Sequence, residues 1–154
     1  MSIQKRLEEL GLELPPAPKA VGVYKPAIMV GNLCMTSGHV PLNSDGTMIK
    51  GRVGAERDVQ YGYDAAKQTG LTMLATLQRD LGSLDRIKRV VKLVGMVWCT
   101  DDFEQHPAVI NGCSELFRDI FGPEAGVGAR SAVGMSSLPL GVTVEIEGIF
   151  EIDE

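Results

Sequence analysis

Residues Ile87 to Cys99 form the part of this sequence that most restricts the fold. Val and Leu occupy both sets of alternating positions in the run, a pattern typical of a central strand that is covered on both faces. Lys92 interrupts this run. The apolar part of the run is far shorter than the roughly 18 to 20 residues that cross a bilayer, so the run is not a membrane span. The chain therefore needs a sheet with further structure packed on each side of this strand.

Two segments show the three- and four-residue apolar spacing of amphipathic helices. Asp58 is expected to cap a helix that runs to about Leu81 and ends at Gly82. A second helical region is expected to start at Asp101 or Asp102 and to settle by Pro107. Its apolar stripe comprises Val109, Cys113, Leu116, Phe117 and Ile120. Because two helices can cover only one face of a sheet, we expect the other face to pack against another copy of the chain.

Val142 to Ile152 has the clearest two-residue periodicity, with Glu145 and Glu147 on the polar face. Short strand-like pieces also lie within residues 21–37, where a turn at 31–32 suits a hairpin, and a further strand is expected from Arg130 to Met135. The predicted fold class is α/β of the α+β kind, a mixed sheet with two helices on one face. Residues 1–19 are predicted to form a helical amino-terminal arm, in which Ser2 caps a short helix, and residues 20–154 to form one domain.

Composition narrows the function classes. The 154 residues carry a formal net charge of -5, which argues against binding to a phosphate backbone. The three cysteines form no C-x-x-C pair and there are two histidines, so we expect buried free thiols, no disulfide and no protein-bound metal. The first residues lack a secretory h-region, and the sequence therefore predicts a cytoplasmic protein.

Arg130 is the strongest candidate functional residue found by pattern alone. It follows a glycine-rich loop and begins a strand that should be buried, where a permanently charged guanidinium needs a carboxylate or a ligand. One interpretation is a structural salt bridge to Glu145 or Glu147, and the other is an anion-binding site. Nucleotide-binding loops, zinc-protease motifs and serine-hydrolase elbows are absent from the sequence.

The segment G-A-R-S-A-V-G-M-S-S-L-P-L-G-V-T-V-E-I-E-G-I-F-E, residues 128–151, resembles the carboxy-terminal signature of the RidA/YjgF reactive-intermediate deaminases, also labelled the L-PSP family. Further similarity lies at residues 22–24, 31–41 and 81–92 and in the helix that carries Asn111, so that the resemblance covers about residues 20 to 152. It is nearest to the longer, less characterised branch of the family.

The resemblance implies a chorismate-mutase-like homotrimer with sheets packed inward and clefts between subunits. It also implies hydrolysis of enamine/imine intermediates such as 2-aminoacrylate to a 2-keto acid and ammonia, without a cofactor or metal. Arg130 and Glu145 match the catalytic positions: the arginine that holds the substrate carboxylate and the carboxylate that positions water. Tyr24, Ser37 and Asn111 match positions that line the cleft, which would bind a small carboxylate-bearing ligand. Backbone carbonyls from Arg130 through Ser131 to Ala132 would accept the imine N–H.

Structural roles are alternatives for several of these residues. Tyr24 could pack at a subunit seam, Ser37 could serve a turn, and Asn111 could cap or bridge backbone. This chain also departs from the family pattern: Ala132 replaces a frequent cysteine, and His39 replaces a frequent glutamine. His39 brings a titratable group near the cleft, or else makes a structural hydrogen bond.

Three functions remain open on the sequence. A deaminase is the leading hypothesis, and a non-catalytic trimeric module that binds a small carboxylate or a partner is the second. RNA cleavage, which the other family label implies, is the third. The net charge argues against it, and the basic residues within 86–92 are more simply explained as a solvated strand end.

Overall fold

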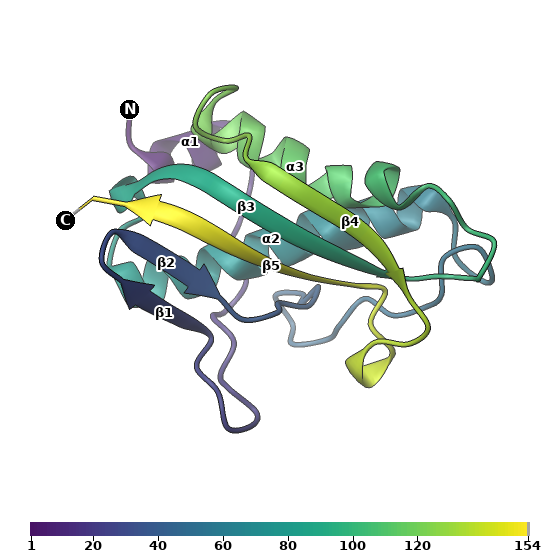
Figure 1. The fold of residues 1–154 in the computed structure, drawn as a ribbon. Helices are drawn as coiled ribbons and strands as arrows, with labels where there is room; N and C mark the ends of the chain where they lie inside the picture. The colour runs from purple at the N-terminus through teal and green to yellow at the C-terminus, as the bar shows by residue number, and fades with distance from the viewer. Residues whose placement is uncertain (154) are drawn as a thin grey trace.

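The computed structural model describes residues 1–153, which form a five-stranded mixed sheet with helices on one face (Figure 1). The strand order is β1-β2-β5-β3-β4; β4 runs parallel to β3 and the other neighbours are antiparallel. This confirms the predicted fold class. The strands are β1 Ala27–Val30, β2 Leu33–Thr36, β3 Ile87–Trp98, β4 Ala129–Met135 and β5 Val144–Ile152, the helices are α1 Ile3–Glu9, α2 Val59–Leu81 and α3 His106–Phe121, and the short 3₁₀ turns are η1 Leu84–Arg86 and η2 Pro139–Gly141.

Helices α2 and α3 form the layer behind the sheet in Figure 1. The Asp58 side chain caps α2 by accepting a hydrogen bond from the Tyr61 backbone N–H, and Gly82 ends the helix at a φ of 83°, as predicted. The two helices approach closely at Gly112, where an added Cβ would collide with the Tyr63 carbonyl oxygen of α2. The apolar stripe predicted for α3 is buried, so the core lies between this helix layer and the sheet.

One predicted boundary is correct in part and another is wrong. Residues 101–102 form a turn, so α3 does not start there; it begins at His106 and has the expected Pro107 in its first turn, where proline needs no amide partner. Residues 21–25 form no strand; Pro26, which has no amide to donate, follows them. The predicted hairpin is present as β1 and β2, which are joined at Gly31 with a φ of 61°.

The amino-terminal arm packs against the helix layer. Ser2 caps α1 as predicted, and Leu7 is 2% exposed. The Ile3 backbone N–H donates to the Asp85 carboxylate over 2.7 Å, and the Arg6 side chain donates to the Asp119 carbonyl oxygen over 2.8 Å. Further along, the Arg79 guanidinium donates to the Pro18 carbonyl oxygen over 2.7 Å. Arg79 of α2 therefore fixes Pro18, at the start of the 18–26 segment, against this helix.

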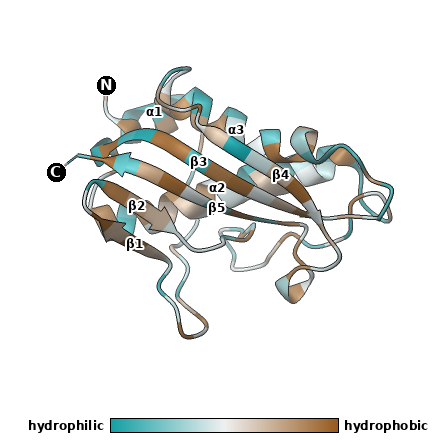
Figure 2. Ribbon diagram, in the orientation of Figure 1, coloured by the Kyte–Doolittle hydropathy of each residue, from teal (hydrophilic) through white to brown (hydrophobic). Residues whose placement is uncertain are grey.

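Hydrophobic residues recur along β1, β3 and β5 (Figure 2). The face of the sheet that turns away from the helices combines exposed apolar side chains with the glutamates of β5. Ile28 and Val30 of β1 are 50% and 56% exposed, and Val133 of β4 is 41% exposed. Buried and partly exposed residues alternate along β3 and β5, so that the helix-facing side chains are covered and the opposite ones are not. Within residues 1–153, no helix is long and apolar enough to span a membrane.

Candidate active site

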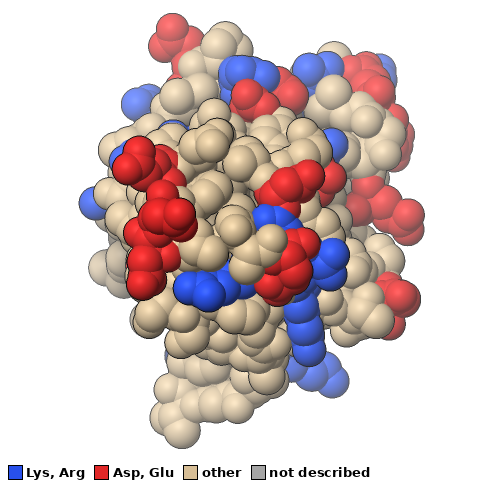
Figure 3. Space-filling view, turned by 90° about the vertical axis from the view of Figure 1, so that its right-hand side faces the viewer, with Lys and Arg blue, Asp and Glu red and all other residues tan. Residues whose placement is uncertain are grey.

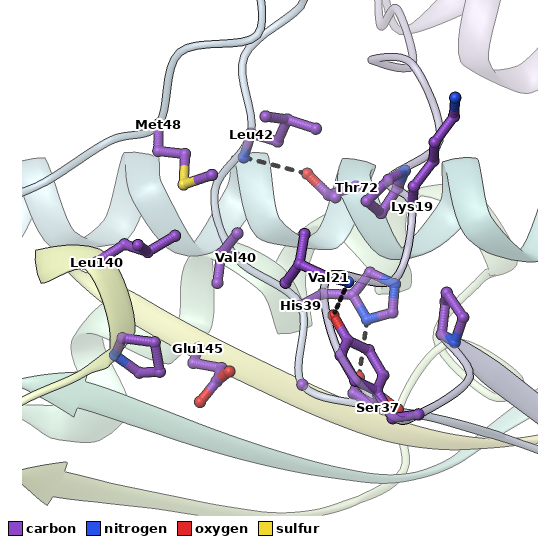
Figure 4. Close-up of a pocket in the computed structure, with 15 residues that line it drawn as sticks. Lys19, Val21, Ser37, His39, Val40, Leu42, Met48, Thr72, Leu140 and Glu145 are labelled. Carbon is purple, nitrogen blue, oxygen red and sulfur yellow. Dashed lines mark hydrogen bonds between the residues drawn. The ribbon is translucent and has the colours of Figure 1, made fainter.

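A cavity of about 440 Å³ lies where the start of β5 meets the segment after β2 (Figure 4). Three of the predicted site residues line it, namely Tyr24, Ser37 and Glu145. Its remaining lining is mostly apolar and comes from residues 18–26, the 38–48 loop, α2 and η2. These residues are Pro18, Lys19, Val21, Pro26, Gly38, His39, Val40, Leu42, Met48, Thr72, Pro139 and Leu140.

Glu145 provides the acidic group of this cavity. Its neighbours Val144 and Ile146 point into the core, so alternation along β5 turns the carboxylate toward the opposite side. Gly38 lies against it, since an added Cβ there would stand 2.7 Å from the Glu145 Oε1 atom. Burial, with a smaller effect of the nearby Glu147 charge, raises the pKa of the Glu145 carboxyl. A carboxyl with a raised pKa is suited to accept and return a proton.

His39 fixes the backbone beside Glu145. Its backbone pairs with Ile146 through two hydrogen bonds of 2.8 and 3.0 Å. Its Nδ1 atom lies 2.7 Å from the Ser37 carbonyl oxygen and its Nε2 atom 2.8 Å from the Thr76 hydroxyl. The carbonyl can only accept, so Nδ1 carries the proton and Nε2 accepts from the hydroxyl. Both interpretations of His39 hold: the imidazole makes structural hydrogen bonds, and it also lines the cavity beside Glu145.

Tyr24 and Ser37 stand at the mouth of the cavity. The Ser37 hydroxyl donates to the Lys25 carbonyl oxygen over 2.5 Å, so it serves a turn and faces the cavity at once. The Tyr24 phenol is half exposed and accepts a 3.4 Å hydrogen bond from the Val21 backbone N–H. The dashed line at Val21 in Figure 4 marks this hydrogen bond. Both hydroxyls lie on the side of the cavity that is formed by residues 18–26.

Arg130 lies at a different hollow, of about 360 Å³, between β4 and α3. Its guanidinium donates to the Asn111 Oδ1 atom over 2.6 Å and to the Ser114 hydroxyl over 3.1 Å. Within residues 1–153 it forms no ion pair, and the predicted alternative of a salt bridge to Glu145 or Glu147 is therefore wrong. Neutral partners therefore orient the guanidinium, and Glu115 and Arg118 line the same hollow.

Arg130 and Glu145 lie on opposite faces of the sheet. Arg130 is in register with Leu93 of β3, whereas Glu145 is in register with Met96, three residues further on. An odd separation along a strand places side chains on opposite faces. Ser131 is exposed next to Arg130, and Ala132 packs partly against the core. A single copy of the chain thus brings Tyr24, Ser37 and Glu145 together and leaves the arginine apart.

Ser114 and Leu140 are among the residues of these hollows that the sequence analysis did not name. Ser114 follows Asn111 by three residues, the spacing that places helical side chains on one face, so this signal was available. Leu140 carries no such signal, because its place at the cavity depends on the shape of η2. Among residues 1–153, no three His, Cys, Asp or Glu side chains gather as metal ligands would.

Comparisons with known proteins agree with this architecture. Residues 4–147 match the family described as "YjgF/chorismate_mutase-like, putative endoribonuclease". The protein TCP17 of Trypanosoma cruzi is 36% identical over 98% of this chain and 94% of its own length. A 2-iminobutanoate/2-iminopropanoate deaminase of Dermatophagoides farinae is 30% identical over 92% of this chain and 95% of its own length. A solved structure titled "putative endoribonuclease", from Shewanella oneidensis, superposes with a TM-score of 0.94 at 33% identity and covers 99% of this chain and 100% of that one.

Proposed function

Because the chain belongs to the YjgF/RidA family, we propose that it is an enamine/imine deaminase whose sites lie in clefts between the copies of a homotrimer. It converts 2-aminoacrylate-like intermediates to 2-keto acids and ammonia. The observation that carries the proposal is the state of Arg130: neutral side chains hold its guanidinium beside a hollow, and among residues 1–153 it forms no ion pair with an acid. A planar, fixed guanidinium binds a carboxylate through two parallel hydrogen bonds.

The reaction needs an orienting anion site, a water and a proton relay. Arg130 holds the substrate carboxylate, and Glu145 orients the water that adds to the C=N carbon. 2-Aminoacrylate first gains a proton at its methylene carbon and loses one from its nitrogen, which converts the enamine into the imine. Water then adds to the C=N carbon, the nitrogen takes up a proton and the water gives one to Glu145, so that a carbinolamine forms. When the C–N bond breaks, the nitrogen leaves as ammonia with protons that are passed through the Glu145 carboxyl, and the 2-keto acid remains. The raised pKa of Glu145 suits this exchange.

Assembly supplies what one copy lacks. Arg130 and Glu145 lie on opposite faces of one sheet, so the proposed reaction needs the arginine of one copy beside the glutamate of another. The exposed face of the sheet, with its apolar Val30 and Val133, supports an assembly in which sheets pack inward. Closed cyclic symmetry then repeats the same cleft at each interface.

We would test the proposal by following keto-acid release from freshly generated 2-aminoacrylate. The Arg130→Ala and Glu145→Gln variants are each expected to lose at least 100-fold in kcat/KM, in keeping with the roughly 10²–10⁴-fold contribution of positioned acid–base groups. Arg130→Lys keeps the charge without the planar fork and is expected to retain partial activity. Wild-type activity no faster than that of Arg130→Ala would refute the proposal.

Mixing the two inactive variants tests whether the site is shared. If Arg130 and Glu145 come from different copies, equal amounts of Arg130→Ala and Glu145→Gln chains refolded together place both native residues at about one quarter of the sites. Activity is then expected to return to about a quarter of the wild-type value. Activity that stays at the level of the separate variants would contradict a shared site.

RNA cleavage has less support from this chain. The family description and the Shewanella title use the word endoribonuclease. Arg86 and Arg89, the arginines of the predicted basic strand end, form ion pairs with Asp153 and Glu151. On the face shown in Figure 3, basic and acidic side chains alternate instead of forming a basic patch. Phosphate binding needs accumulated positive charge, so these observations favour the small carboxylate as ligand.

A further inference from the structure

Two further charged side chains share the hollow with Arg130, and each of them is engaged elsewhere. Glu115 and Arg118 line this hollow together with Arg130. The Arg118 guanidinium donates from Nε and Nη2 to the Asp119 carboxylate, over 3.1 Å each. The Glu115 Oε2 atom accepts a hydrogen bond from the Tyr63 hydroxyl of α2. Among residues 1–153, no ion pair joins Glu115 to either guanidinium.

Glu115 is nevertheless close to the position that the Arg130 guanidinium occupies. The Nη1 atom of Arg130 donates to Asn111 and to Ser114, which precede Glu115 on α3 by four residues and by one. Side chains four residues apart on a helix have Cβ atoms about 5–6 Å from each other, so rotation of the Glu115 side chain would bring its carboxylate to the guanidinium. A carboxylate in that position would occupy the donors that the proposed reaction needs for the substrate.

Tyr63 provides the contact that directs the Glu115 carboxylate away. The backbones of α2 and α3 approach closely where Gly112 meets the Tyr63 carbonyl oxygen, and the phenol crosses from there to Glu115. Tyr63 and Glu115 are both half-buried, and a hydroxyl that donates to a carboxylate forms one of the stronger hydrogen bonds in proteins. This hydrogen bond is the main cause that raises the pKa of Tyr63 to about 12, so the hydroxyl keeps its proton and remains a donor at neutral pH.

We propose that Tyr63 and Glu115 are positioning residues: the Tyr63 hydroxyl holds the Glu115 carboxylate off Arg130 and so keeps the guanidinium open to the carboxylate of the substrate. The inference rests on the proposed function, since it takes Arg130 as the anion site, and it adds the residues that keep this site open. Without the hydroxyl, Glu115 competes with the substrate for the same donors. An ion pair present in about four fifths of the molecules raises the apparent dissociation constant about fivefold, and a partly exposed ion pair is strong enough for this.

The test compares the binding of pyruvate, a stable 2-keto acid, by calorimetry with kcat and KM for freshly generated 2-aminoacrylate. Tyr63→Phe removes the hydroxyl and keeps the ring. We expect it to weaken pyruvate binding and to raise KM, each at least fivefold, while kcat stays within about twofold of the wild-type value. The double variant Tyr63→Phe/Glu115→Gln also removes the competing charge and is expected to restore pyruvate binding and KM to within about twofold.

Tyr61→Phe is the matched control on the same helix. Its hydroxyl donates to the Lys50 carbonyl oxygen over 2.9 Å, and Tyr61 does not line the Arg130 hollow. Pyruvate binding and KM are expected to be the same in Tyr61→Phe as in the wild type. A fivefold change in this control would refute the inference, because any lost tyrosine hydroxyl of α2 would then have the effect.

The remaining outcomes separate this inference from the proposed function. Wild-type pyruvate binding and KM in Tyr63→Phe would refute the role of Tyr63. A defect that persists in the double variant would also refute it, because Tyr63 would then act through helix packing and not through the Glu115 charge. If the wild type hydrolyses no imine but pyruvate binding follows the expected pattern, the deaminase activity is refuted and the control of Arg130 by Tyr63 stands. A wild type that neither binds pyruvate nor hydrolyses an imine would refute both.

Discussion

Glu145 and His39 line the same cavity, but burial gives them opposite effects on how the stability of the folded state changes with pH. Burial disfavours the charged form of each: it raises the pKa of the Glu145 carboxyl and lowers the pKa of the His39 imidazole. The charges nearest to His39, Arg79 and Asp80, act against each other. Both groups face the cavity. A change in their protonation therefore changes the charge of the proposed site and the free energy of unfolding together.

Replacement of Glu145 by Gln is expected to stabilise the protein at pH 8 while it abolishes activity. The Glu145 carboxyl keeps its proton to a higher pH in the folded state than in the unfolded state. The protein therefore loses stability as the pH rises from about 4.5 through the raised pKa. Glutamine removes that loss. Unfolding midpoints in urea at pH 5 and pH 8 would check this, and a variant that gains no more at pH 8 than at pH 5 would contradict it.

His39→Gln is expected to flatten the acid side of the stability profile. The depressed pKa of the imidazole means that the unfolded chain binds the proton first, so the wild type loses stability as the pH falls below about 6.5. Glutamine does not titrate in this range. Thermal unfolding between pH 5 and 7.5 measures the difference in slope. Parallel profiles for the two proteins would rule out His39 as the source.

Helices α2 and α3 position Asn111 and Ser114 through the close contact at Gly112. An added methyl group at Gly112 would meet the Tyr63 carbonyl oxygen, which belongs to the backbone and cannot rotate away. Gly112→Ala is therefore expected to push the helices apart and to destabilise the fold by about 1–3 kcal/mol or more, the usual cost of overpacking. Denaturant unfolding measures this, with the exposed Asp119→Ala as the control; a cost below 0.5 kcal/mol would contradict the packing argument.

The elements were predicted well from the sequence where local patterns decide the structure. Caps at Ser2 and Asp58 and the alternation of β5 are local signals, and each is present. The strand expected within residues 21–25 is absent, and α3 begins after residues 101–102. Pro26 and Pro107 explain both differences, because each restricts the backbone locally. The contact between Arg130 and Asn111 spans 19 residues. It arises because β4 returns parallel to β3 under α3, which no local pattern encodes.

At the scale of the whole molecule, the exposed face of the sheet is expected to control both assembly and activity. Val133 shares a register row with Met96 and Glu145 on this face and is 41% exposed. Val133→Glu places a charge in the proposed interface, where an unpaired buried charge is costly. It is expected to give monomers in sedimentation and at least a 100-fold loss of activity. Lys67→Glu, on the exposed side of α2, is the control; a fully assembled Val133→Glu protein would contradict the interface.

The place of β5 has a consequence for synthesis. It is the last strand along the chain, yet it lies between β2 and β3 and pairs with both. While the ribosome is still making residues 144–152, the emerging chain exposes two unpaired strand edges that have no partner other than each other or a neighbouring nascent chain. Folding therefore waits for the final strand, and polypeptides that stop short of it should aggregate or be degraded instead of accumulating as partly folded domains.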